Sequence, residues 1–197
     1  MNHHAFNRKP HNERPVGTRR RRPFRLLAGI GRTVDSASSA AFIRAMRGTA
    51  TGVNVVTTDG SAGRFGLTVS AFSSVSAEPP TVLVCINRRS PACRAVRENR
   101  VFCVNVLSAG QHPVADTFSG NTAGGQSYDF NTGSWAVSRA GSPLLGNSVA
   151  SFDCTLESAI DAGTHTIFIG AVRVVEHHNT GPLIYTNGSY RRACSEL

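Results

Sequence analysis

The sequence predicts a mainly β domain, folded as an antiparallel barrel with peripheral helices. Short apolar runs of strand length, rich in β-branched residues, recur along the chain. Asp59-Gly60 lies in a Gly-rich segment between two of these runs, which is typical of a hairpin turn. Helical patterns do not alternate regularly with the strands, which argues against a doubly wound parallel sheet.

The basic charge of the chain is concentrated at its N-terminus. Residues 1–32 hold nine Lys and Arg side chains against Glu13 alone, which leaves twelve basic and eleven acidic residues for 33–197. The segment 1–32 has almost no periodic apolar face, so it is predicted to be a disordered basic tail. Its apolar part, LLAGIG, is shorter than the apolar region of an export signal. Residues 33–197 are predicted to form one domain.

Cysteine usage and hydropathy predict a cytoplasmic protein. The five cysteines are an odd number without a C-x-x-C pair, and three lie in apolar runs, which is typical of buried free thiols in a reducing compartment. No apolar stretch reaches membrane-spanning length. The cysteines are Cys85, Cys93, Cys103, Cys154 and Cys194.

The first ordered element is predicted to be an amphipathic helix at 35–48. Asp35 and Ser36 are candidate N-caps, apolar residues recur at helical spacing, and Gly48 ends the pattern. The β-branched runs on both sides of the Gly-rich turn then predict a hairpin over 52–72.

The remaining elements are short apolar or β-rich segments separated by turn residues. In chain order they are predicted as a strand at 81–87, a helix at about 90–99, a strand at 100–108, a helix at about 110–119, and strands at 151–163 and 165–178.

Small hydroxylated residues are concentrated in the second strand of the hairpin. In an extended strand over 66–74, Thr68 and Ser70 share a face with Gly66 and Phe72, because successive side chains point to opposite faces. This face leaves room for a flat polar ligand, and the opposite face is apolar enough to belong to the core. A solvent-facing edge strand rich in Ser and Thr is the alternative interpretation.

A possible anion site lies at the start of the helix predicted at about 90–99. Ser90 is a candidate N-cap, Pro91 occupies the first helical position, and Arg88 and Arg89 precede them. Free backbone N–H groups, the helix dipole and adjacent guanidinium groups together can bind a phosphate or carboxylate. Most helix N-termini bind only water, so this signal is weak by itself.

The chain resembles the short-chain flavin reductases, the reductase components of two-component flavin-dependent monooxygenases, from about Phe42 to Arg191. Six segments in the family's order carry the resemblance: FIRAMRGTATGVNVVTT, GLTVSAFSSVSAEPPTVLVCIN, FCVNVLS, GSPLL, GTHTIFIGAV and PLIYTNGSYR. The resemblance implies a flavin-binding split β-barrel, antiparallel and of Greek-key type, assembled as a homodimer.

The resemblance also implies where a flavin binds. The ring lies along GLTVSAF, where small hydroxylated residues let the strand approach it closely, and Ser90 marks the phosphate side. Ala92 stands where relatives often carry Ser or Thr, so Arg88, Arg89 or backbone N–H groups would have to hold the phosphate. The implied cofactor-binding residues are Leu67, Thr68, Val69, Ser70, Phe72, Ser73, Cys85, Ile86, Asn87, Ser90, Pro91, Ala92, Asn105, Gly163 and Thr164.

His165 is the catalytic candidate. In the family, Gly-Asp-His or a close variant lies where nicotinamide stacks on flavin, and the matching triplet here is Gly163-Thr164-His165. The implied role is to bind and orient the nicotinamide, because the cofactors supply the hydride chemistry. Thr164 in place of Asp removes a carboxylate that could orient the imidazole.

The predicted function is an NAD(P)H:flavin oxidoreductase that supplies reduced flavin to a monooxygenase or halogenase. FMN and FAD, and NADH and NADPH, remain open as cofactors, and no metal site is expected. One alternative is an oxidoreductase that retains its flavin on the same barrel. Another is a non-catalytic dimeric binding protein that uses the basic tail, although charge runs of this kind are more often solvated than bound to nucleic acid.

Overall fold

The computed structural model describes residues 36–120, 122 and 125–193. The tail predicted at 1–32 and Cys194 lie outside the described residues. The described part is mainly β, as predicted, and its three helices are α1 (Ser39–Gly48), α2 (Pro91–Asn99) and α3 (His112–Ser119). None of the described helices is both long and apolar enough to cross a bilayer.

Twelve strands make up the rest of the regular structure of the described residues. They are β1 (Thr51–Gly52), β2 (Asn54–Thr58), β3 (Phe65–Val69), β4 (Phe72–Ala77), β5 (Pro80–Asn87), β6 (Val101–Val106), β7 (Trp135–Val137), β8 (Pro143–Leu145), β9 (Ala150–Ala162), β10 (His165–His177), β11 (Leu183–Thr186) and β12 (Ser189–Arg192).

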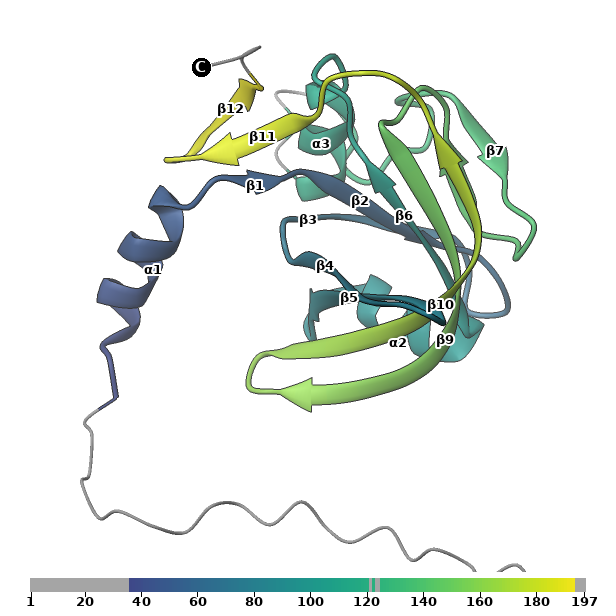
Figure 1. The fold of residues 1–197 in the computed structure, drawn as a ribbon, viewed down its shortest axis with the longest axis horizontal. Coiled ribbons are helices and arrows are strands. Elements are labelled where there is room, and N and C mark those ends of the chain that lie inside the picture. The colour runs from purple at the N-terminus through teal and green to yellow at the C-terminus, as the bar shows by residue number, and fades with distance from the viewer. Residues whose placement is uncertain (1–35, 121, 123–124, 194–197) are drawn as a thin grey trace, which may run out of the picture. The chain divides into compact units, whose positions relative to one another are not determined.

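Seven strands form one antiparallel sheet in the order β3-β2-β6-β9-β10-β5-β4. The sheet curls, and its two edge strands, β3 and β4, lie together in Figure 1. These two strands are also consecutive in the chain. Among the described residues β3 pairs with β2 and β4 pairs with β5. Strand pairing therefore confirms a mainly β antiparallel architecture with a large curled sheet, and among the described residues it does not show closure into the predicted split barrel.

Two predictions about element boundaries are wrong. Helix α1 begins at Ser39, and its N-cap is Ser38, whose Oγ accepts a hydrogen bond from the Ala41 N–H at 3.2 Å. The strand expected over 66–74 is interrupted at Ser70 and Ala71, where β3 ends and the chain turns into β4. The predicted alternation of side chains between the two faces of one strand over 66–74 consequently does not hold beyond Ser70.

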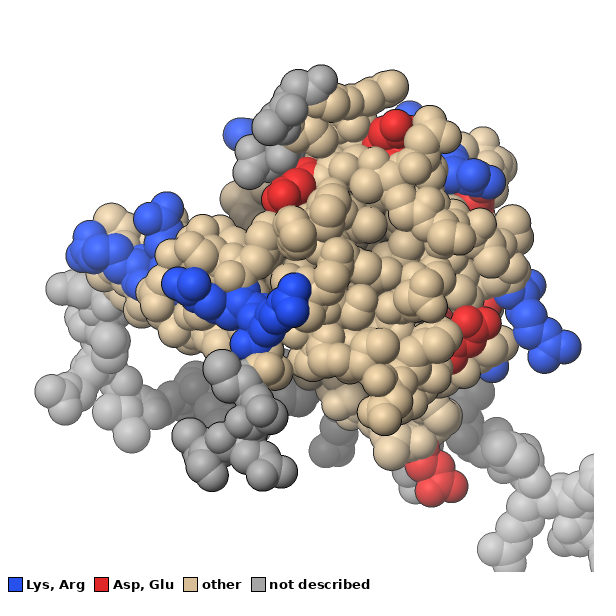
Figure 2. All heavy atoms as spheres, turned by 90° about the horizontal axis from the view of Figure 1, so that it is seen from above, with Lys and Arg blue, Asp and Glu red and all other residues tan. Residues whose placement is uncertain are grey.

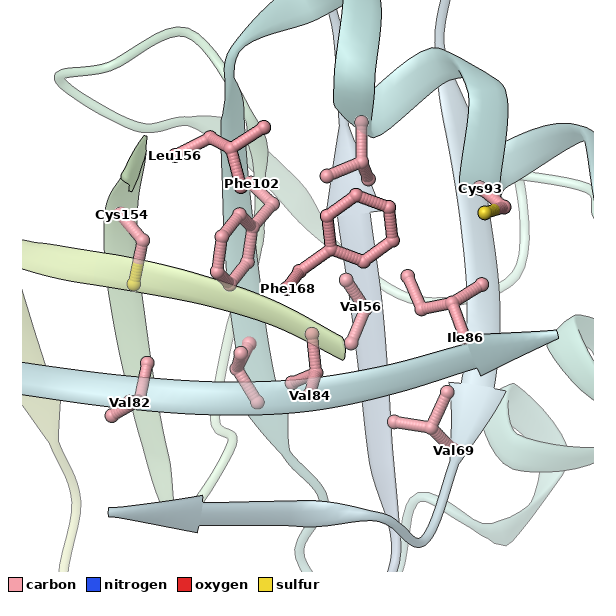
Figure 3. Packing of buried hydrophobic residues seen from close by; sticks show 12 residues of the cluster. Val56, Val69, Val82, Val84, Ile86, Cys93, Phe102, Cys154, Leu156 and Phe168 are labelled. Atoms are coloured by element: carbon pink, nitrogen blue, oxygen red, sulfur yellow. The ribbon is translucent and has the colours of Figure 1, made fainter. Parts of the chain in front are cut away.

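The first hydrophobic core fills the concave side of the curled sheet. Phe102 and Phe168 lie at its centre, surrounded by valines of β2 and β5 and by Ile86, and Figure 3 shows these side chains pointing toward one another. Helix α2 covers this core with Cys93 and Val96. The end of β5 is therefore held rigidly against α2.

The second core lies on the other face of β2. Val55, in the middle of this strand, packs with Leu107, Phe118 and Leu145, and helix α3 supplies the covering side chains. Successive residues of β2 serve different cores because their side chains alternate between faces, so Val56 belongs to the first core. All five residues of β2 are buried as a result.

A separate three-stranded sheet, in the order β1-β11-β12, lies beside α3 and the start of β2. Helix α1 projects from this sheet (Figure 1), and the Asn187 N–H donates a hydrogen bond to the Arg47 carbonyl at 2.7 Å. Strands β7 and β8 form a further two-stranded sheet. Strand β3, at the edge of the large sheet, shares a cavity lining with residues of the small sheet.

Candidate functional site

The end of β5 meets the tip of the β9–β10 hairpin. Asn87 is the register partner of His165, and the Arg88 N–H donates to the Thr164 carbonyl at 3.0 Å. Gly163 adopts a φ of +56° in the turn, a conformation that glycine reaches without strain. A cavity of about 440 Å³, which we call the hairpin cavity, is lined by Asn87, Arg88, Arg89, Gly163 and Thr164.

His165 is exposed at the rim of this region. Its Nδ1 lies 2.9 Å from the Thr164 hydroxyl, so Thr164 orients the imidazole in place of the missing carboxylate. Nε2 makes no hydrogen bond within the part of the chain that the structure describes. This nitrogen therefore remains available to a ligand.

Asp161 ties the hairpin tip to helix α2. Its carboxylate accepts hydrogen bonds from Arg97 and from the Thr166 hydroxyl, the latter at 2.7 Å, and Arg88 lies 3.6 Å away. The hydrogen bond from Thr166, together with the charges of Arg88 and Arg97, lowers the pKa of Asp161 below its ordinary value. The group is therefore ionised at neutral pH and holds His165 beside β5.

A second cavity, of about 400 Å³, lies at the N-terminus of α2, and we call it the helix cavity. It is lined by Arg64, Phe65, Gly66, Leu67, Arg89, Ser90, Pro91, Ala92, Tyr128 and Phe130. The Ser90 Oγ accepts from the Ala92 N–H at 3.3 Å, and the Cys93 N–H donates to the Ser90 carbonyl. Since Pro91 has no N–H, the chain itself already uses the donors that the sequence offered to an anion.

Three arginines lie near these two cavities, and they differ in what they contact. Arg64 pairs with Asp59 at 2.8 Å and lies over the Phe130 ring, and Arg88 is near Asp161. Arg89 is exposed, lines both cavities, and has no ion pair among the described residues. Arg89 is therefore the cation best placed to bind a phosphate.

A third cavity, of about 310 Å³, lies between β3 and the small three-stranded sheet, and we call it the tyrosine cavity. Its lining comprises Val53, Thr68, Val69, Ser70, Asp116, Ser119, Tyr185, Gly188, Ser189 and Tyr190. The Thr68 hydroxyl donates to the Ala115 carbonyl at 2.8 Å. Sequence reasoning assigned no role to Asp116, Tyr185 or Tyr190, although the two tyrosines belong to the segment PLIYTNGSYR.

Four predicted site residues lie near the β3–β4 bend but line none of the three cavities. Phe72 packs against Phe152 with ring centroids 5.4 Å apart, and the Ser73 hydroxyl donates to the Ser74 carbonyl. Cys85 is half-buried, and its N–H donates to the Ala71 carbonyl at 3.0 Å. Ile86 is fully buried in the first core, so its side chain supports the site from below.

Asn105 does not agree with the prediction that it contacts a cofactor. Its side chain is fully buried, and its amide donates to the Val55 carbonyl and to Thr57 at 3.1 and 3.2 Å. Its oxygen accepts from the Leu145 N–H and the Ser151 hydroxyl. Every polar atom of the side chain is thus committed within the protein, and Asn105 anchors β8 and β9 to β2 and β6.

The linings of the three cavities offer groups suited to a flat ring and to a phosphate-bearing chain. Their volumes are in the range of small-molecule sites. Arg89 can bind an anionic end, Leu67 and Gly66 offer an apolar surface, and Thr68 and Ser70 offer hydroxyls at the other side of β3. The exposed imidazole of His165 can orient a second ligand.

Comparisons with known proteins identify the family of this chain. The model of the flavin reductase like domain family matches residues 46–193, and the chain belongs to this family. The protein named FMN reductase (NADH) RutF of Escherichia coli (strain K12 / DH10B) is 42% identical over 147 residues, which cover 72% of this chain and 88% of that one.

Two solved structures show the same fold. The NADH:FAD oxidoreductase SgcE6 of Streptomyces globisporus C-1027 superposes with a TM-score of 0.74 at 30% identity, covering 85% of this chain and all of that one. BorF, the flavin reductase component of a bacterial two-component tryptophan halogenase, gives a TM-score of 0.72 at 32% identity, covering 81% and 100%. This chain is similar to both over nearly the whole domain.

Proposed function

We propose that this protein is an NAD(P)H:flavin oxidoreductase that reduces FMN or FAD and releases the reduced flavin to a partner monooxygenase or halogenase. The observation that carries the proposal is the cavity lined by Asn87, Arg89, Gly163 and Thr164, with His165 paired to Asn87 beside it, in a chain of the flavin reductase family. The names of the E. coli and Streptomyces relatives favour NADH as the reductant.

In this proposal, residues of this protein bind the flavin and the nicotinamide and orient them toward each other. Arg89 and the Ser90 hydroxyl hold the flavin phosphate, and Leu67 and Thr68 lie along the ring. His165 holds the nicotinamide over the ring through Nε2, since its Nδ1 is engaged by Thr164. When bound, the flavin accepts a hydride from the reduced nicotinamide, and a proton from solvent completes the reduction.

Exchangeable flavin binding is consistent with the structure of the phosphate end. Ala92 is buried and offers no hydroxyl, and Ser90 caps its own helix. Arg89 consequently supplies most of the attraction for the phosphate. One charge-assisted contact suits a reduced flavin that has to leave the protein after each turnover.

The protein is further proposed to act as a homodimer through α1. Phe42, Ile43 and Met46 are 60%, 51% and 49% exposed, and no residue of α1 is buried. A ten-residue helix is too short to be stable in water without a packed apolar face. Figure 2 shows a broad surface of low charge beside the basic side chains at the α1 end, as expected of an interface between two copies.

The test of the proposed function is NADH and NADPH consumption, measured by absorbance in air with full-length protein and added FMN or FAD. We expect turnover that increases with added flavin. A His165→Asn variant should raise KM for the nicotinamide and lower kcat, because orientation is lost. His177→Asn is the matched control, since His177 is an exposed histidine at the other end of β10.

The assay separates the proposal from its alternatives. Flavin that remains bound through turnover, with no dependence on added flavin, would identify an oxidoreductase that retains its flavin. No consumption with any pair of cofactors, from protein of native circular dichroism, would contradict the proposal. Deletion of residues 1–32 should leave turnover unchanged, whereas binding through the basic tail would be lost.

A further inference from the structure

The tip of the β9–β10 hairpin lies at the margin of the large sheet. Strand β9 ends at Ala162, β10 begins at His165, and all residues over 161–165 are exposed. Strand β5, on the other side of β10, ends at Asn87, the register partner of His165. A segment with so few packing contacts opens easily unless a further contact holds it.

Arg97, in the last turn of α2, makes a further contact with this tip. Its Nη2 donates to the Asp161 carboxylate and, at 3.1 Å, to the Thr166 hydroxyl. Thr166 in turn donates to Asp161 at 2.7 Å, so the three side chains are hydrogen-bonded to one another. Asp161 and Thr166 are register partners in the second pair from the turn. The guanidinium of Arg97 therefore holds both strands of the hairpin, and we call these hydrogen bonds the hairpin contact.

The hairpin contact differs from an ordinary surface ion pair. Exposed ion pairs contribute little, because solvent screens them and both side chains lose freedom. Here the Thr166 hydroxyl belongs to a fully buried residue, and the thiol of Cys93, buried on α2, donates to it at 3.5 Å. The Arg97 guanidinium also lies over the Phe168 ring, 5.6 Å from its centroid. The contact is thus fixed by groups of both the helix and the hairpin.

Helix α2 connects the hairpin contact with the proposed phosphate site. Four of its nine residues are buried, and Cys93 and Val96 belong to the first core, so the helix is a rigid support. Arg89 and Ser90 directly precede its first residue, whereas Arg97 lies near its other end. Figure 1 shows α2 beside the β9–β10 hairpin. One rigid element therefore supports both the phosphate site and the hairpin tip.

We propose that Arg97 is a positioning residue, which fixes the hairpin tip on α2 and thereby sets the place of the His165 imidazole relative to the flavin. The inference rests on the proposed function and adds a residue that lines none of the described cavities. A displacement of about 1 Å can slow a reaction roughly a hundredfold. Loss of the hairpin contact should consequently lower kcat and spare flavin binding.

The first test needs no cofactor. Hydrogen–deuterium exchange of the full-length protein, followed by mass spectrometry, measures backbone opening over residues 159–168. Arg97→Met keeps an apolar side chain and removes the guanidinium, so it should raise the exchange rate of this segment roughly tenfold, the effect of one lost charged hydrogen bond. Thr166→Val removes only a hydroxyl and should also accelerate exchange. Arg94→Met is the matched control, since Arg94 is exposed on α2 and pairs with Glu98.

The second test separates positioning from flavin binding and from stability. Arg97→Met should lower kcat with NADH and FMN roughly ten- to hundredfold and leave KM for FMN unchanged. Urea denaturation should show nearly wild-type stability, because the side chains of Arg97 and Asp161 are both half-exposed. Arg97→Lys keeps the charge and should recover part of kcat. The double variant of Arg97→Met and Thr166→Val should be no slower than the slower single variant, since both act on the hairpin contact.

The two tests distinguish failure of this inference from failure of the proposed function. Exchange over 159–168 that is unchanged in both Arg97→Met and Thr166→Val would overturn the inference, whether or not the protein oxidises NADH. Faster exchange with unchanged kcat would also overturn it, because the reaction would then not depend on the hairpin contact. A wild type that oxidises no NADH would contradict the proposed function, while faster exchange in both variants would still support the contact between α2 and the hairpin.

Discussion

Arg89 is the side chain on which we expect binding of a flavin phosphate to depend most. It is the exposed cation that lines both cavities without an ion pair among the described residues. We expect Arg89→Ala to raise KM for FMN roughly tenfold, the effect of one charged hydrogen bond, and to leave KM for riboflavin unchanged. Riboflavin carries no phosphate, so a ratio of the two KM values measured by NADH oxidation isolates the contact.

The control for Arg89 is an arginine on helix α2, which begins two residues after Arg89. Arg94 is exposed on α2 and pairs with Glu98 at 3.8 Å. Arg94→Ala removes an equal charge outside all the described cavities, so it should change neither KM value. If Arg89→Ala raised KM equally for FMN and for riboflavin, that result would contradict a phosphate contact at this residue.

Tyr190 should show its environment in alkaline solution. Burial, together with the hydrogen bond and charge of Asp116, raises the pKa of Tyr190 from 10.0 to about 12. The raised pKa stabilises the folded state fully below pH 10, and this contribution is lost as pH rises toward 12. Phenolate absorbance should show one of the three tyrosines ionising near pH 12, and Tyr190→Phe should remove that step. A wild-type titration complete near pH 10 would contradict this.

Individual residues also mark where sequence reasoning reached its limit. Asn87, Gly163 and Thr164 line one cavity and His165 pairs with Asn87, and this proximity was predictable because a strand end and a tight turn can be recognised from residue types. That these residues bind a cofactor stays a prediction. Asn105 is different, because its role depends on partners contributed by distant segments. The sequence shows that a side-chain amide is present, but it does not show which groups form hydrogen bonds with it.

At the scale of elements, the long strands were predictable and the short ones were not. Strands β5, β6, β9 and β10 are six to thirteen residues long and rich in apolar and β-branched residues, enough for the pattern to indicate a strand. Strands β1, β7 and β8 have two or three residues and carry no periodic signal. The break at Ser70 and Ala71 contains neither Gly nor Pro, so no local turn signal in the sequence indicates it.

Close packing between β10 and β6 makes a glycine essential to the hairpin. A Cβ on Gly170 would lie 2.4 Å from the Phe102 ring and 2.9 Å from the Cβ of Cys154. We expect Gly170→Ala to lower the free energy of unfolding by about 1 to 3 kcal/mol through overpacking, measured by urea denaturation. Gly181→Ala is the control because its Cβ would meet open space. Equal stability of the two variants would contradict the close approach.

At the scale of the whole molecule, the exposed apolar face of α1 leads us to expect a homodimer. Phe42→Asp places a charge on the exposed apolar face of this helix and should convert a dimer to a monomer, measured by light scattering on a sizing column. Val137→Asp, at a valine of β7 that is 71% exposed, should leave the dimer intact. A monomeric wild type, or a Phe42→Asp variant that remains dimeric, would contradict the role of α1.

The placement of the thiols matters for a protein whose product reacts with oxygen. Free reduced flavin reacts with oxygen to give oxidised flavin and hydrogen peroxide, and peroxide attacks thiolates. Burial raises the pKa of Cys85, of Cys103 and of Cys154, the last to about 12, so these groups stay protonated at neutral pH. Cys93 is buried on the inner face of α2. The described domain can therefore work beside a source of peroxide without oxidising its own core.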